Sequence, residues 1–196
     1  MRILICGIGA IGSNLTARLV SDLKGCEITV LDKDTVEERN ISAGTQYYTR
    51  EVLGEPKVEA LQYLIDKNYE KQINIINQEL TEKNTDVFLA QFTDALIIDC
   101  LDNYEGRKNI QQRAYHRHLN CLHIGFSQDF TFAIEWSPKY TAPSDITSGF
   151  DICEMPGASA FVNKVASIGA LVAEEFVSTG RKIEIIGNKF THSIIV

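Results

Sequence analysis

The stretch that decides the fold is ILICGIGAIGSNL, residues 3–15. Its apolar run leads directly into Gly7, Gly9 and Gly12, which have G-x-G-x-x-G spacing. A strand, a glycine turn and a helix in this order bring backbone N–H groups close to a phosphate, and the helix N-terminus adds partial positive charge. The stretch therefore predicts a nucleotide site at the first turn of a βαβ unit.

Asp32 stands 20 positions after Gly12, at the end of the next apolar run. An acidic residue at this spacing accepts hydrogen bonds from ribose hydroxyls in dinucleotide-binding folds. The alternative is that the glycines serve only to form the turn, but the presence of Asp32 at this spacing favours a nucleotide site. Because NAD and ATP both present ribose and phosphate, the glycine turn alone leaves the choice between them open.

The rest of the chain alternates short β-like runs with longer helical patterns, which is typical of a parallel sheet with helices on both faces. We expect strands at residues 2–6, 27–32, 73–77, 95–99 and 121–126, and helices at 11–23, 50–68, 84–92 and 104–118. Beyond these lie an alternating strand at 129–136, an irregular loop at 137–157, a helix at 158–180 and two short strands at 183–187 and 190–195. The pattern predicts an α/β, Rossmann-like mixed sheet, parallel in its N-terminal half, with antiparallel strands added after about residue 126.

The composition predicts a single globular domain over residues 1–196. The net charge of −7 argues against a broad nucleic-acid surface, which requires a basic face. No apolar stretch reaches the roughly 20 residues of a membrane span, and the first residues carry no leader cleavage site, so we expect a cytoplasmic protein. The five cysteines include no C-x-x-C pair, which argues against the usual structural zinc site.

Two further segments carry a family resemblance. Residues 31–61 read LDKDTVEERNISAGTQYYTREVLGEPKVEAL, and residues 97–110 read IIDCLDNYEGRKNI. In order and in nearly all spacings they resemble the superfamily that activates ubiquitin-like proteins, whose simplest members are the bacterial ThiF and MoeB adenylyltransferases. The likeness covers residues 1 to about 125. The matching positions are Asp32, Asp34, Val36, Asn40, Gln46, Gly54, Pro56, Lys57, Val58, Asp99, Asp102, Asn103 and Arg107.

The resemblance implies that a C-terminal carboxylate attacks the α-phosphate of ATP to give an acyl-adenylate and pyrophosphate. It implies ATP and Mg²⁺, a ubiquitin-like or sulfur-carrier partner with a C-terminal Gly, and a homodimer. Lys57 would then reach the phosphates, Asn40 would donate its amide near the reacting atoms, and Asp102 would hold Mg²⁺. The expected nucleotide contacts are Gly7, Gly9, Gly12, Asp32, Asp34, Gln46 and Asn103.

Several of these residues also have a plain structural interpretation. Lys57 could be an ordinary solvated lysine on a helix, and Asn40 could be a turn residue or a helix cap. Asp102 could be the N-cap of the helix at 104–118. Arg107 is expected to be a structural ion-pair partner. The joint match favours the functional interpretation of the set.

The pattern breaks at Thr45, which stands where the family places an Arg just before the Gln, in a segment two residues longer than the family's. Losing such a donor from a developing phosphate charge raises a barrier by about 3 kcal/mol, by analogy with lost oxyanion donors. Arg39 and Arg50 are nearby but not at the family position. Catalytic competence therefore depends on which cation replaces the Arg.

Cys153 lies in the long loop, within GFDICEMPG, residues 149–157. In the family this loop can carry the thiol that forms a thioester or persulfide, so Cys153 is a candidate nucleophile. The alternative is a packing role, because its neighbours in sequence are acidic and reactive cysteines need an electropositive setting. The histidines at 116, 118 and 123 invite a metal interpretation, but solvated or core histidines are the default.

Three hypotheses from different classes follow. The leading one is an ATP-dependent adenylyltransferase that activates the C-terminal carboxylate of a ubiquitin-like or sulfur-carrier protein, with Lys57, Asp102, Asn40 and Cys153 as catalytic residues. The second is a catalytically weak or silent nucleotide- or carrier-binding module within a larger assembly. The third is an NAD-dependent oxidoreductase, which the glycine turn alone permits but in which Lys57 and Asp102 have no evident role.

Overall fold

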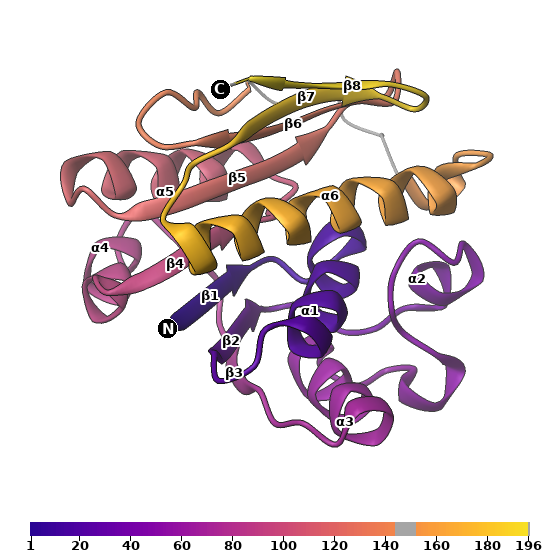
Figure 1. Ribbon diagram of the computed structural model, residues 1–196. Coiled ribbons are helices and arrows are strands. Elements are labelled where there is room, and N and C mark those ends of the chain that lie inside the picture. The colour runs from indigo at the N-terminus through magenta and orange to yellow at the C-terminus, as the bar shows by residue number, and fades with distance from the viewer. Residues whose placement is uncertain (144–151, 196) are drawn as a thin grey trace.

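A computed structural model describes residues 1–143 and 152–195 of the chain (Figure 1). Its eight strands form one sheet in the order β3-β2-β1-β4-β5-β6-β7-β8. The strands are β1 (Arg2–Cys6), β2 (Glu27–Asp32), β3 (Asn74–Asn77), β4 (Ala95–Asp99), β5 (Asn120–Phe126), β6 (Thr131–Trp136), β7 (Glu184–Asn188) and β8 (His192–Ile195). The first five are parallel and the last three join antiparallel, so the predicted mixed Rossmann-like sheet is confirmed.

Helices cover both faces of the parallel part. The helical elements are α1 (Ala10–Asp22), α2 (Glu38–Ser42), η1 (Arg50–Val52), α3 (Lys57–Tyr69), α4 (Thr85–Leu89), η2 (Ala90–Phe92), α5 (Tyr104–His116), η3 (Ile152–Glu154) and α6 (Ala158–Thr179). Helices α1, α3 and α6 bury the sheet face that carries Ile3 and Ile5, whereas α4 and α5 bury the opposite face, which carries Leu4 and Cys6. Alternation along β1 therefore feeds two separate cores.

The register brings the carboxyl ends of the central strands to one edge. Cys6 at the end of β1 pairs with Leu31 on one side and with Asp99 on the other. The turns that follow β1, β2 and β4 therefore emerge together. In doubly wound sheets this edge is where ligands bind.

The expected helix at 50–68 is wrong in its first third. Residues 50–52 form only a short 3₁₀ turn, and α3 begins at Lys57, directly after Pro56. Gly54, at φ +87°, and its neighbour bond instead to the segment after β2: Gly54 N–H donates to Val36 O, and Val36 N–H donates to Glu55 O, both at 2.9 Å. This backbone pairing displaces the helix start and ties Lys57 to the end of β2. The sequence also gave no sign of α2.

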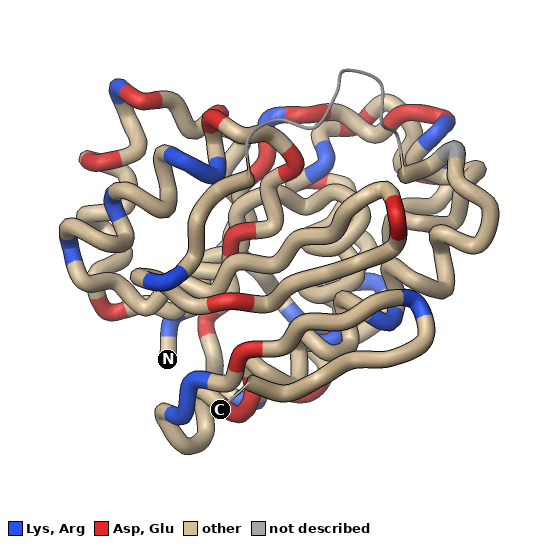
Figure 2. The backbone as a smooth tube through the Cα atoms, turned by 90° about the horizontal axis from the view of Figure 1, so that it is seen from above, with Lys and Arg blue, Asp and Glu red and all other residues tan. Residues whose placement is uncertain are grey.

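The expected irregular loop at 137–157 is described only in part. Residues 144–151 lie outside the described part of the chain, and the short turn η3 follows them. Among the described residues, no helix combines the length and apolar character needed to cross a membrane. Basic and acidic residues are interspersed along the backbone in the view of Figure 2.

Candidate functional site

The glycine turn after β1 is shaped by steric necessity at two of its glycines. Gly7 has φ +83°, a conformation that side chains rarely adopt, and its N–H donates to Leu31 O at 2.8 Å. A Cβ on Gly12 would lie 1.9 Å from the carbonyl oxygen of Gly7, so α1 packs against the turn only because residue 12 is glycine. By contrast, a Cβ on Gly9 would meet no atom within 4 Å. Gly9 therefore faces open space, as a residue beside a ligand would.

The N-terminus of α1 opens onto this space. Gly9 is its N-cap, no side chain caps it, and its first turn holds no acidic residue. Such a helix end presents unpaired N–H groups and partial positive charge. These features fit a phosphate group, and Ser13 Oγ, which donates to Gly9 O at 2.6 Å, steadies the turn.

Asp32 is buried and holds the glycine turn directly. Its Oδ2 accepts from Ile8 N–H at 2.8 Å, and its Oδ1 accepts from Asp34 N–H at 2.9 Å. The Tyr48 hydroxyl donates to Ile8 O at 2.7 Å from the other side. Tyr48 is therefore a buried packing residue. The contact of Asp32 with ribose stays a prediction, but its role in the turn is evident.

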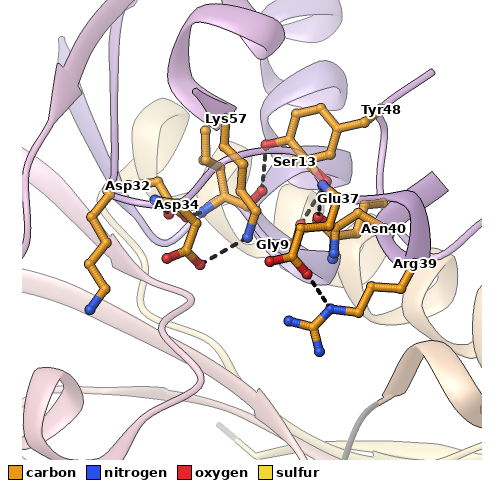
Figure 3. Close-up of polar contacts among 12 residues, drawn as sticks. Gly9, Ser13, Asp32, Asp34, Glu37, Arg39, Asn40, Tyr48 and Lys57 are labelled. Atoms are coloured by element: carbon orange, nitrogen blue, oxygen red, sulfur yellow. Dashed lines mark hydrogen bonds and ion pairs between the residues drawn. The ribbon is translucent and has the colours of Figure 1, made fainter. Parts of the chain in front are cut away.

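Lys57, the first residue of α3, brings a buried cation to the end of β2. Its side chain is 9% exposed, and its Nζ lies 3.1 Å from Asp34 Oδ2, in a side chain that is 53% exposed. The backbone fixes the pair, since Lys57 N–H donates to Asp34 O at 2.8 Å. Figure 3 shows the lysine and its partner beside Gly9 and α2. The fold thus holds Lys57 in place. The plain interpretation, which required a solvated helix lysine, is wrong.

Asn40 is buried on α2, beside this pair (Figure 3). Its Oδ1 accepts from Glu37 N–H at 2.9 Å, so the carbonyl side of the amide stabilises the first turn of α2. The amide nitrogen bonds to no residue in the described ranges and is available as a donor. Both interpretations of Asn40, turn residue and donor, are therefore compatible in one side chain.

The two arginines considered as substitutes for the missing family Arg both carry acidic partners. Arg39 Nε lies 2.5 Å from Glu37 Oε2, and Figure 3 shows this pair close to Asn40. Arg50 pairs with Glu38 at 2.5 Å, with 75% of its own side chain exposed. Arg39 is therefore better placed than Arg50 to reach a phosphate beside Asn40.

Thr45, at the family Arg position, is fully buried and contacts the candidate nucleophile. Its Oγ1 lies 3.2 Å from Cys153 Sγ, and Gln46 Nε2 lies 3.9 Å from the same sulfur. Asn14 on α1 donates to Thr45 O at 2.9 Å, which places this cluster against the helix that begins at the glycine turn. The buried Oε1 of Gln46 has no hydrogen-bond partner among the described residues. The structure thus joins Cys153 to the site, although the two lie over 100 residues apart in sequence.

Asp102 and Asn103 occupy the turn after β4. Asp102 is exposed and forms no ion pair with a described residue, which leaves its carboxylate available for a cation. Asn103 is the N-cap of α5, with its Oδ1 accepting from Gly106 N–H at 2.7 Å, so the interpretation of Asp102 as the cap is wrong. A Cβ on Gly7 would lie 3.0 Å from Leu101, so this turn touches the glycine turn.

Arg107 is buried within α5 and has a structural role, as expected. It donates to Leu101 O and, at 2.8 Å, to Ile124 O; it also donates to the Tyr140 hydroxyl at 3.0 Å. Burial alone would lower the pKa of Arg107, but nearby Asp99 and Tyr140 raise it. Its hydrogen-bond partners are thus two backbone carbonyls and the Tyr140 hydroxyl, whereas Asp99 acts on it through charge and not through a direct ion pair.

A metal centre built from protein ligands alone does not occur in the part of the chain that the structure describes, where no group of three His, Cys, Asp or Glu side chains has a suitable arrangement. His116 and His118 are exposed and His123 is buried, as the default interpretation predicted. Cys100 and Cys121 are buried, and burial raises the pKa of both thiols. A cation at Asp102 therefore requires phosphate and water oxygens to complete its coordination.

The structure gathers the predicted residues into three adjoining groups: the glycine turn with Asp32, the pair of Lys57 and Asp34 beside Asn40, and Cys153 with Gln46. Asp102 and Asn103 adjoin the first group through Leu101. Sequence reasoning missed Glu37, whose pairing depends on α2, and the contact of Thr45 with Cys153. A short acidic stretch before Asn40 was the only signal for the former.

Comparison with known proteins places these features in a family. Residues 1–189 match the ThiF family. Ubiquitin-like modifier-activating enzyme 5 of Drosophila ananassae is 28% identical over 152 residues, which are 72% of this chain and 37% of that protein. The chain thus spans little more than a third of the length of this relative.

Solved structures with a similar fold include the Microcin C7 biosynthetic enzyme MccB in complex with N-formylated MccA, at a TM-score of 0.75 and 15% identity, over 99% of this chain and 63% of that one. E. coli MccB with ATP aligns at a TM-score of 0.73 and 16% identity, over 99% of this chain and 62% of that one. At these identities the likeness concerns the fold.

Proposed function

The chain belongs to the ThiF family, and from this premise we propose that it is an ATP-dependent adenylyltransferase for the C-terminal carboxylate of a ubiquitin-like or sulfur-carrier protein. The observation that carries the proposal is the buried Lys57 at the start of α3, beside an uncapped helix N-terminus at Gly9. A cation and a helix end at one sheet edge favour a polyphosphate. A hydride carrier gives Lys57 no comparable role.

In this proposal the backbone of the glycine turn binds phosphate oxygens, and Lys57 neutralises their charge. Without a nucleotide, Lys57 pairs with Asp34. Because the Asp34 side chain is more than half exposed, its carboxylate can return to water when a phosphate replaces it beside Lys57. Asp32 accepts from the ribose hydroxyls while retaining Ile8 N–H. Asn40 donates its amide hydrogens toward the α-phosphate. These groups act by positioning and charge neutralisation, which is what adenylyl transfer chiefly requires.

Asp102 is proposed to hold Mg²⁺ together with the phosphates. Its exposed carboxylate fits a hard cation that prefers oxygen ligands and commonly uses only one or two protein carboxylates. When bound, the cation offsets negative charge on the leaving group. Asn103, fixed as the α5 N-cap, holds the turn in place through Gly106 N–H.

The proposed adenylation exchanges one bond at the α-phosphorus of ATP. A carboxylate oxygen of the partner's C-terminal Gly bonds to the α-phosphorus of ATP, the bond from that phosphorus to the bridging oxygen breaks, and pyrophosphate leaves. The product is an acyl-adenylate. This chain contributes no covalent bond to the step.

Cys153 is proposed to take the acyl group next. Its thiolate would attack the acyl carbon, form a thioester and release AMP. Support comes from geometry: Cys153 Sγ lies next to Gln46, which the family motif places at the nucleotide, and next to Thr45, which Asn14 ties to α1. A homodimer is a further expectation from the family resemblance, and the cytoplasmic location expected from the sequence stays a prediction.

The test is ATP–pyrophosphate exchange with Mg²⁺ and candidate carriers that end in Gly-Gly. Exchange is expected with the correct carrier, and it should fall at least about tenfold in Lys57→Met, since a hydrogen bond to a charged group contributes about 1.5–3 kcal/mol. Lys33→Met is the matched control, because Lys33 sits at the same strand end but pairs with Glu79 on the surface. A wild-type protein that exchanges with none of its carriers, yet binds them, contradicts the proposal.

A second function, a nucleotide-binding module without turnover, is favoured by one observation. Thr45 is fully buried against Cys153, so no side chain at that position reaches a phosphate. Calorimetry with ATP separates the two functions. Tight binding without exchange supports the module, whereas binding and exchange together support the enzyme. Stronger protection by NAD than by ATP in thermal unfolding would support the oxidoreductase.

A further inference from the structure

The turn after β4 is clasped at the residue just before Asp102. Leu101 N–H donates to Asp99 Oδ1 at 3.0 Å, and Leu101 O accepts from Arg107 Nε. Both polar groups of Leu101 are therefore held by side chains. These groups belong to the peptides on either side of Leu101, and the second peptide leads directly into Asp102, so the clasp holds the backbone from which the exposed carboxylate projects.

Asp99 is itself held by His123 on β5. His123 Nδ1 lies 2.9 Å from Asp99 Oδ2, and both side chains are fully buried. Burial alone would raise the pKa of Asp99, but the charge of Arg107 and the hydrogen bonds from His123 and Leu101 hold it below its usual value. Asp99 is therefore ionised at neutral pH and accepts only. His123 Nδ1 must then be the donor in this bond.

The imidazole is fixed from the antiparallel side of the sheet. His123 Nε2 lies 2.9 Å from Ser137 Oγ, just after β6. Tyr140 stacks on the ring at a centroid distance of 3.8 Å and an interplanar angle of 10°, and its hydroxyl accepts from Arg107. Asp99, Ser137 and Tyr140 together therefore fix the orientation of the ring.

The order Ser137, His123, Asp99 is that of a nucleophilic triad, but its setting differs. Ser137 is only 5% exposed, so a substrate carbonyl does not reach its hydroxyl. The chain of bonds leads instead away from Ser137, through His123 and Asp99, to the turn at Leu101. Its end point is the candidate metal ligand.

We propose that His123 is a positioning residue for Asp102: through Asp99 it holds the Leu101 N–H, one residue before Asp102, and so sets the direction in which Asp102 meets a cation. The proposal rests on the proposed function for the identity of that cation. It assigns residues 137–140, which belong to the antiparallel part, a role in shaping a turn of the parallel part.

The experiment compares His123→Asn with His123→Gln. The Asn amide nitrogen occupies roughly the place of Nδ1 and keeps the bond to Asp99, whereas the Gln amide nitrogen replaces Nε2 and keeps only the bond to Ser137. The readout is amide hydrogen exchange at Leu101, divided by that at Cys100, whose N–H bonds to Cys6 O in the sheet. General destabilisation raises both rates together and leaves the ratio unchanged.

We expect the ratio to rise about tenfold in His123→Gln and to stay within about twofold of wild type in His123→Asn. Losing a hydrogen bond to a charged group costs more free energy than losing a bond between neutral groups. An unchanged ratio in a folded His123→Gln overturns the proposal. If His123→Gln does not fold, Ser137→Ala replaces it. Ser137→Ala should raise the ratio about two- to threefold, the effect typical of losing a neutral hydrogen bond, and an unchanged ratio again overturns the proposal.

Nucleotide binding gives a second readout. The Mg²⁺ concentration that half-saturates ATP binding should rise about three- to tenfold in His123→Gln, while ATP affinity without Mg²⁺ stays constant, because only the metal ligand moves. An equal loss with and without Mg²⁺ contradicts positioning. If the wild type binds no ATP, the proposed function fails, and the Leu101 ratio still decides the role of His123.

Discussion

The turns after β2 and β4 lie at the same sheet edge but hold their charged groups in different ways. After β4, Asp99, His123 and Arg107 are buried together, and Asp99 and Arg107 clasp the backbone of Leu101. After β2, the buried Lys57 pairs with Asp34, which is largely exposed. The first arrangement is rigid and costly to break, whereas the second can exchange its partner. A site that must receive and release a polyphosphate benefits from both: a fixed carboxylate platform and an exchangeable cation.

The largest expected effect of this difference is on stability. Arg107→Met removes the charge that compensates buried Asp99 and three hydrogen bonds, so the free energy of unfolding should fall by about 3–5 kcal/mol. Lys57→Met leaves an exposed Asp34 in water, so it should change by no more than about 1 kcal/mol. Urea unfolding at pH 7 measures both. Similar losses in the two variants would show that the turns do not differ in the way described.

The next effect concerns nucleotide affinity and should fall on the other turn. Lys57→Glu places a negative charge beside the glycine turn, and ATP should bind about 10- to 100-fold more weakly, as expected for a lost charge-assisted bond. Lys33→Glu makes the same change of charge on the surface, where Lys33 pairs with Glu79, and should weaken binding only about two- to threefold, since exposed charges are screened. Calorimetry at fixed salt provides the comparison. Equal losses of ATP affinity in the two variants would mean that the effect comes from the net charge of the protein and not from the position of Lys57.

A pH titration sharpens the contrast. The pKa of Asp99 is lowered in the folded protein, so its ionised form stabilises the fold above the ordinary carboxyl pKa of about 3.9, and this contribution is lost as the pH falls through the lower, folded value. Asp99→Asn removes this titration. Relative to its own value at pH 7, the variant should lose less stability below about pH 4 than wild type does. A steeper acid loss in Asp99→Asn would contradict the sign of the shift.

Much of this arrangement follows from the sequence, because it depends on local rules. The glycine spacing and the apolar runs each act within a few residues, so they predict the sheet and the first turn, whereas the role of Lys57 was implied by the family resemblance. The true start of α3 was missed because the bonds between Val36 and residues 54–55 override the helical pattern at 50–56.

The parts that escaped prediction depend on long-range packing. Thr45 and Cys153 are 108 positions apart and meet beside the start of α6, where Ser159 Oγ donates to Gly44 O at 2.6 Å. The bond between Asp99 and His123 requires β4 and β5 to pair in one register. Residue types alone suggested a metal interpretation for the histidine and a cap for Asp102, since a sequence gives spacing but not the neighbour across a sheet.

The smallest expected effect is at Thr45, where the family Arg is replaced. A thiolate at Cys153 accepts only, so the Thr45 hydroxyl at 3.2 Å must donate to it. Thr45→Val keeps the shape and removes this bond, so iodoacetamide should modify Cys153 about two- to tenfold more slowly near neutral pH, the loss typical of one hydrogen bond. The rate is measured in a Cys26→Ser background, because Cys26 is the other cysteine that is not fully buried and Cys6, Cys100 and Cys121 are all buried. Faster modification in Thr45→Val would show that Thr45 shields the sulfur instead, and would place Cys153 with the rigid, structural groups rather than with the exchangeable ones.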